Sequence, residues 1–148
     1  MDENKYQEVI QFAIQKEIEA ADFYRRASQA VTYSGTRDLF LDFAKQEEGH
    51  KKLLEGLNLE KMPQIKLEKI PDLKISDYMV DAEFKPDILY ADILRIAMKR
   101  EEHSIKLYRD LKPLDGDNAL TRVFDFLIQE ETKHKYQLEK IYDDEILK

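Results

Sequence analysis

The sequence predicts an all-α fold, namely a four-helix bundle made of two antiparallel helical hairpins joined by one long crossover. Two observations predict it. Long segments repeat their apolar residues at steps of three and four, which is the periodicity of one helical face. The breaks between helices are of two kinds: short turns that contain glycine, and one long stretch that contains three of the four prolines.

The positions of these breaks define four helices. Gly35 interrupts the first long segment, and Pro113 with Gly116 interrupts the second, so a short turn divides each segment into two helices. Because a short turn leaves consecutive helices side by side and antiparallel, each pair forms a hairpin. The crossover, residues 58–86, joins the two hairpins. We expect the helices over about residues 3–32, 36–57, 87–112 and 118–144.

The chain, residues 1–148, is expected to form a single domain, because its length suits one hydrophobic core. The net charge of −7 is spread over residues of both signs, which argues against a nucleic-acid-binding surface. The acidic start lacks the apolar region of a signal peptide, and no apolar run is long enough to span a membrane. We therefore expect a cytoplasmic protein that binds neither nucleic acid nor membrane.

One helical face contains side chains that do not suit a core. Within residues 36–57, the steps of three and four run through Phe40, Phe43, Glu47, His50 and Leu54. This face is apolar except for the glutamate and the histidine in its middle. The pair is therefore a candidate functional site.

The same pattern occurs a second time. When the chain is shifted by 84 residues, the segment of about 3–57 aligns with that of about 87–144 without a gap. Glu17 and Glu101 each interrupt the apolar stripe of their own helix, as the first candidate pair does. The interior is therefore predicted to receive four carboxylates and two imidazoles. The polar pairs that coincide in this repeat include Glu17 and Glu101, Tyr24 and Tyr108, Glu47 and Glu131, and His50 and His134.

Metal ions would account for this polar interior. A carboxylate in a core costs several kcal/mol when nothing compensates its charge, and four carboxylates at one level also repel one another. Two divalent cations would balance four negative charges, while neutral imidazoles would complete the coordination without adding charge. The chain has no cysteine, and an oxygen-rich donor set favours iron or manganese over structural zinc. The residues therefore predict two metal ions per chain, iron or manganese, with zinc as an alternative.

The ligand pattern resembles the di-iron carboxylate centre of ferritin-like proteins, in which two helices give one Glu each and two give a Glu-x-x-His motif. The segments EIEAADFY, EEGHKKLLE, EEHSIKLY and EETKHKYQLE resemble the rubrerythrin branch of that superfamily. The resemblance implies that Glu47 and Glu131 bridge the metals, and that Tyr24 and Tyr108 donate hydrogen bonds to carboxylates beside them. It implies the metal ligands Glu17, Glu47, His50, Glu101, Glu131 and His134.

Two features depart from the family pattern. Full-length rubrerythrins carry a rubredoxin-like iron domain held by four cysteines, and this chain has none, so its electrons must come from a separate donor such as a rubredoxin or a flavoprotein. Rubrerythrins also have a further Glu one turn after the third-helix ligand, where this chain has Ser104. We therefore expect weak discrimination between peroxide and dioxygen. The remaining four-Glu, two-His set also resembles the ferroxidase centre of bacterioferritins.

Three functions are compatible with these residues. The favoured one is an oxidoreductase in which a reduced di-iron centre reduces peroxide or dioxygen. The second is ferroxidase chemistry for iron handling, and the third is a metal-binding helical bundle without catalysis. A homodimer is the expected assembly.

Neighbours of the predicted ligands test the helical register. Because one residue rotates a side chain by about 100° around a helix, a residue beside a ligand should point away from the core face. The residues expected to lie at the surface for this reason are Glu48, Glu102 and Glu130; His103, two residues after Glu101 and about 200° around the helix, is expected to face solvent as well.

Overall fold

The structure is a computed structural model, and it describes residues 3–57, 70–71, 73–76, 83–85, 87–112 and 119–147. Within these ranges the chain forms four α-helices and no strand. By internal packing the chain divides into two compact units, residues 1–62 and 63–148, and each unit holds one pair of helices. None of these helices, as far as they are described, has both the length and the apolar character needed to cross a membrane.

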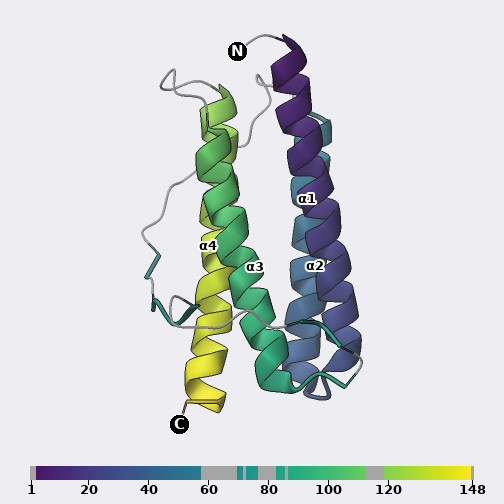
Figure 1. Cartoon of the computed structure of the whole chain (residues 1–148), viewed down its shortest axis with the longest axis vertical. Coiled ribbons are helices and arrows are strands. Elements are labelled where there is room, and N and C mark those ends of the chain that lie inside the picture. The colour runs from purple at the N-terminus through teal and green to yellow at the C-terminus, as the bar shows by residue number, and fades with distance from the viewer. Residues whose placement is uncertain are drawn as a thin grey trace. The chain divides into compact units, whose positions relative to one another are not determined.

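Hairpin 1 consists of α1 (Glu3–Ala30) and α2 (Ser34–Glu55), which pack along each other in opposite directions (Figure 1). The chain turns between them at Tyr33, an extended residue whose carbonyl accepts a hydrogen bond from the Arg37 N–H at 2.9 Å. The Arg37 side chain also donates to the Val31 carbonyl at 3.3 Å. One arginine therefore stabilises the turn through both its backbone and its side chain.

Hairpin 2 consists of α3 (Tyr90–Leu111) and α4 (Ala119–Glu145). The Tyr90 hydroxyl, at the start of α3, donates to Glu145 Oε2, at the end of α4, at 2.7 Å. At the opposite end, the Lys112 ammonium lies 2.6 Å from Asp125 Oδ1. The start of one helix therefore meets the end of the other, so the pair is antiparallel. The predicted turn at Pro113 and Gly116 lies outside the described residues.

Both hairpins bury the apolar stripes that the steps of three and four predict. In hairpin 1 the buried apolar residues include Ile10, Ala13, Ala21, Tyr24, Phe40, Phe43 and Leu54. In hairpin 2 they include Leu94, Ala97, Ile105, Tyr108, Phe124, Leu127 and Leu138. Helical periodicity therefore decides which residues of each helix are buried.

The crossover is described only in part. Of the predicted stretch 58–86, residues 58–69, 72, 77–82 and 86 lie outside the described residues. The described residues 75–76 bind hairpin 2, since their backbone N–H groups donate to the Glu139 carboxylate. In Figure 1 one portion of this stretch, drawn in teal, lies beside α4, in keeping with these contacts.

The structure confirms the predicted all-α class and the two helical hairpins of the four-helix bundle. The ends of the four helices agree with the predicted ends to within three residues. The largest difference is at the start of α3, which was expected near residue 87 and begins at Tyr90, because Leu89 is extended and caps the helix with φ −77° and ψ 149°. The single-domain assignment stays a prediction.

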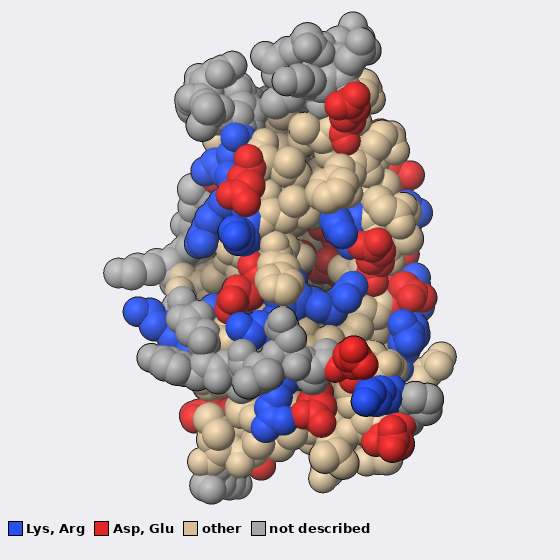
Figure 2. Space-filling model, viewed as in Figure 1, with Lys and Arg blue, Asp and Glu red and all other residues tan. Residues whose placement is uncertain are grey.

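Charges of both signs are interspersed on the surface. Figure 2 shows Lys and Arg side chains among Asp and Glu side chains over the visible face, rather than a patch of one sign. In hairpin 1, for example, Arg25 lies 3.3 Å from Glu48, and Lys16 lies 3.3 Å from Glu19. The negative net charge is therefore not concentrated in one acidic region of this face.

Candidate metal centre

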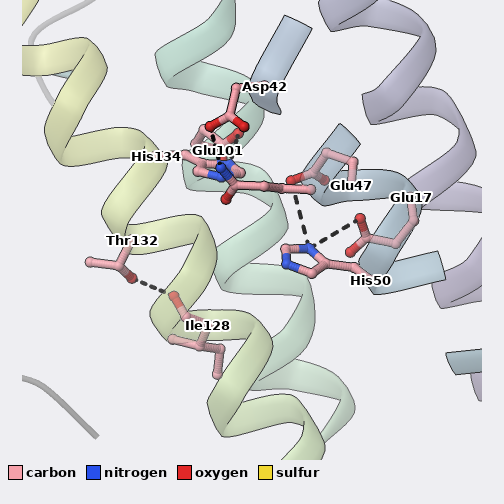
Figure 3. Close-up of polar contacts among 9 residues, drawn as sticks. Glu17, Asp42, Glu47, His50, Glu101, Ile128, Thr132 and His134 are labelled. Atoms are coloured by element: carbon pink, nitrogen blue, oxygen red, sulfur yellow. Dashed lines mark hydrogen bonds and ion pairs between the residues drawn. The ribbon is translucent and has the colours of Figure 1, made fainter. Parts of the chain in front are cut away.

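Hairpin 1 brings two carboxylates and one imidazole together in its interior. Glu17 comes from α1, and Glu47 and His50 come from α2; their side chains are directed toward one another (Figure 3). His50 Nδ1 lies 3.6 Å from Glu17 Oε2 and 3.7 Å from Glu47 Oε1. Each of the three residues is at most 6% exposed. We call them half-site 1.

The sequence of α2 explains how this half-site forms. Glu47 and His50 are three residues apart, so they lie one turn apart on the same helical face. Phe43 and Leu54 lie on that face before and after them, and both are buried. The apolar neighbours therefore hold the polar pair in the interior.

Hairpin 2 repeats the arrangement. Glu101 comes from α3, and Glu131 and His134 come from α4; all three are at most 2% exposed. They offer one ligand atom each, and these atoms lie within 4.8 Å of one another. His134 Nδ1 lies 3.4 Å from Glu101 Oε1. We call these residues half-site 2.

The donor set of each half-site fits a divalent cation. Two carboxylates carry the charge that balances one such ion, and a neutral imidazole adds a ligand without adding charge. Burial of two carboxylates beside each other is costly in a protein interior unless a positive charge compensates them. Oxygen ligands with one nitrogen suit iron and manganese. Each half-site is therefore a buried Glu/His cluster able to bind a metal ion.

Tyr24 and Tyr108 are buried among aromatic rings. The Tyr24 ring lies with its centre 5.2 Å from Phe43 and 5.7 Å from Phe40. The Tyr108 ring stacks on Phe124 with 5.7 Å between the ring centres. These contacts fix the rings in the core of each hairpin. The hydrogen bonds expected from their hydroxyls to ligand carboxylates stay a prediction.

The neighbours of the ligands lie off the core face, as expected. Glu48 is partly exposed and pairs with Arg25, while Glu130 is partly exposed and lies 3.5 Å from Lys133. His103 is exposed. Glu102 is also partly exposed, but it accepts a hydrogen bond from a crossover residue, which the sequence did not indicate. The predicted register of α2, α3 and α4 is confirmed by these residues.

The role of Glu139 is not apparent from the sequence. This α4 residue is buried, and its carboxylate accepts hydrogen bonds from two crossover backbone N–H groups. Glu139 is eight residues after Glu131, which is about 80° around the helix, so its position predicts a face next to the ligand stripe. The internal repeat does not predict the burial of Glu139 either, because the equivalent residue, Glu55, is exposed.

Comparison with known proteins identifies the family. The family model for Rubrerythrin matches residues 8–142, a stretch that runs from α1 to α4 and includes both half-sites. The chain belongs to the rubrerythrin family. Comparison with the curated proteins and with the solved structures gave no match. The predicted resemblance to rubrerythrins is therefore confirmed by the family match and not by an individual relative.

Proposed function

We propose that the two half-sites together bind two iron ions, and that the reduced centre transfers electrons to hydrogen peroxide or dioxygen. Membership of the rubrerythrin family supports this function. The observation that carries the proposal is the double occurrence of a buried Glu, Glu, His set, once in each hairpin. A single buried polar cluster would be weak evidence for metal binding, because one such cluster can occur in a core by chance. Two such clusters at equivalent positions of the repeat favour the same role for both, namely the binding of a metal ion.

In this proposal each hairpin supplies the main ligands of one ion. Glu17 and His50 hold one ion, in keeping with the 3.6 Å contact between them, and Glu101 and His134 hold the other. Glu47 and Glu131 would be ligands shared by the two ions, as the family resemblance implies. When bound, two ferrous ions supply the two electrons that convert one hydrogen peroxide and two protons into two water molecules.

The oxidised centre must then be reduced by a donor other than these 148 residues. The chain has no cysteine to hold an iron–sulfur cluster, and its four glycines do not form a dinucleotide-binding fingerprint. We propose a rubredoxin or a flavoprotein as the electron donor.

The first test is the metal content of the protein purified without added metal. We expect two iron ions per chain. Glu131→Ala should lower this number because it removes a bridging carboxylate, whereas Glu130→Ala should leave it unchanged. One ion or fewer in the wild type, or equal losses in the two variants, would contradict the proposal.

The second test is the reaction itself. The anaerobic di-ferrous protein, mixed rapidly with either oxidant, should show the visible absorbance of the oxidised centre after one equivalent of peroxide. If the centre stays ferrous after mixing with either oxidant, the proposed oxidoreductase function is excluded.

Ser104 favours ferroxidase chemistry as a second candidate, because the four-Glu, two-His set that remains without the further Glu also resembles a ferroxidase centre. Iron storage requires a hollow shell of many subunits, whereas the favoured function is compatible with the homodimer that we propose. Size-exclusion chromatography with light scattering separates the two. A large shell that takes up many iron ions per chain would favour storage.

A further inference from the structure

A buried contact outside the half-sites ties the crossover to both helices of hairpin 2. Glu139 Oε2 accepts hydrogen bonds from the backbone N–H groups of Ile75, at 2.7 Å, and Ser76, at 3.2 Å. The Ser76 hydroxyl donates to Glu102 Oε2 on α3 at 2.6 Å. Ser76 and Glu139 are at most 1% exposed. We call Ile75, Ser76, Glu102 and Glu139 the crossover clamp.

The crossover clamp lies on the face of hairpin 2 that adjoins half-site 2. Each ligand of that half-site is followed in sequence by a residue that lines one cleft, namely Glu102, Thr132 or Lys135. The cleft has a volume of about 410 Å³, and Glu139 and residues 70–71 line it too. Because consecutive residues are rotated by about 100° around a helix, the cleft and the ligands occupy neighbouring faces of the same two helices. A displacement of α3 or α4 at the cleft therefore displaces the ligands.

Electrostatics strengthen the clamp on α3. Burial raises the pKa of Glu102, but the Ser76 hydrogen bond and the positive charges of Lys99 and Lys135 lower it by more, so that the pKa lies below the usual value. The Lys99 ammonium is 3.6 Å from Glu102 Oε1. Hydrogen bonds to an ionised acceptor are about twice as strong as those between neutral groups. The Ser76 hydroxyl is therefore held firmly beside the ligand-bearing turn of α3.

Hairpin 1 provides an internal comparison. Glu55 occupies the position in α2 that corresponds to Glu139 in the repeat, and it is exposed. The two half-sites have the same ligands, but among the residues that the structure describes the clamp contacts are made to hairpin 2. This difference points to different rigidity of the two half-sites.

We propose that Glu139 is a positioning residue for half-site 2, and that the metal ion held there is released more slowly than the ion held by half-site 1. This inference rests on the proposed function. Glu139 holds residues 75–76 against α4, and Ser76 in turn holds α3 at Glu102, the residue after the ligand Glu101. Ligands whose helices are fixed before binding lose less freedom when an ion binds, and they recapture a departing ion more readily.

The test is the release of ferrous ions to a coloured chelator under anaerobic conditions. The wild type should release its two ions in two phases; His134→Ala should remove the slow phase and His50→Ala the fast one. Glu139→Gln should accelerate the slow phase at least tenfold and change the fast phase less than twofold. Glu55→Gln, the matched control, should change neither phase. A slow phase that is unchanged in Glu139→Gln would overturn the proposal.

General loss of stability is distinguished by two further variants. Val123→Ala trims a buried α4 residue away from the clamp and should lower the melting temperature without a selective change in the slow phase. Ser76→Ala removes only the hydrogen bond to Glu102 and should also accelerate the slow phase, which decides the matter if Glu139→Gln does not fold. Equal acceleration of both phases in the clamp variants would overturn the positioning role. A wild type with fewer than two ions would instead contradict the proposed function.

Discussion

Replacing Glu131 with methionine should stabilise the metal-free protein and destabilise the metal-loaded one. Glu131 is 1% exposed, and its ligand atom lies within 4.8 Å of those of Glu101 and His134. Methionine has a similar length, no charge and a flexible side chain, so it can fill the same space. The substitution therefore separates the contribution of this carboxylate to folding from its contribution to metal binding.

The expected gain without metal follows from the charges that are removed. Two charged carboxylates no more than 4.8 Å apart repel each other by at least about 3.5 kcal/mol at an effective dielectric constant of about 20. Methionine abolishes this repulsion and the desolvation cost of one carboxylate. Replacement of buried charges by well-packed apolar residues stabilises proteins by about 1–4 kcal/mol. We expect the free energy of unfolding of the metal-free variant to rise by about 2 kcal/mol.

The expected loss with metal follows from linkage. A bound ion stabilises the folded state by about 2.7 kcal/mol when its free concentration is a hundred times its dissociation constant. Two ions then contribute about 5 kcal/mol, and removal of a bridging ligand weakens both. If neither ion binds the variant, it loses the whole of this contribution; after the gain of about 2 kcal/mol is counted, it should then be up to about 3 kcal/mol less stable than the loaded wild type.

Urea unfolding followed by circular dichroism measures both effects, once with a chelator and once with saturating ferrous ion under anaerobic conditions. Glu130→Met is the control, because Glu130 is a partly exposed residue paired with Lys133. It should change stability by less than about 0.5 kcal/mol in either condition. A metal-free Glu131→Met protein that is less stable than the wild type would refute the reasoning, because it would mean that this carboxylate supports the fold itself.

Three other outcomes are expected. Metal analysis should show that His50→Ala loses one of the two ions while His103→Ala, at an exposed position, keeps both; equal content in the two variants would exclude His50 as a ligand. Rapid mixing should show that wild-type oxidation by peroxide is less than a thousandfold faster than by dioxygen, and that Ser104→Glu shifts this ratio toward peroxide; an unchanged ratio would mean that position 104 does not reach the metals. Sustained peroxide consumption should need a rubredoxin or flavoprotein in addition to a nicotinamide cofactor, and turnover with the cofactor alone would disprove the need for a separate donor.

The burial of the candidate ligands could be predicted because helical periodicity is a local property. Once Phe40, Phe43 and Leu54 define the core face of α2, the positions of Glu47 and His50 on that face follow from their spacing alone. The repeat then transfers the same argument to α4. The start of α3 was less predictable, since Leu89 caps the helix without a side-chain hydrogen bond and so leaves no signal in the sequence.

The burial of Glu139 could not be predicted for a different physical reason. Its hydrogen-bond donors are backbone N–H groups 63 and 64 residues away, in a segment outside the helices. Every residue except proline has the same backbone N–H donor, so the sequence of residues 75–76 carries no pattern that identifies their acceptor. The repeat was misleading here, because Glu55 and Glu139 are equivalent in sequence but differ in exposure.

Each hairpin carries a complete set of charges for one divalent ion. Two carboxylates and one imidazole from the two helices of a hairpin offer ligand atoms within 4.8 Å of one another. Because two carboxylates neutralise one such ion, binding offsets the cost of burying them within the same hairpin. In hairpin 2 the crossover clamp fixes the helices by contacts that do not involve the ligands, whereas the corresponding residue of hairpin 1 is exposed to solvent. On the proposed function, the two ions therefore differ in how firmly their ligands are held, although the ligands themselves are the same residue types.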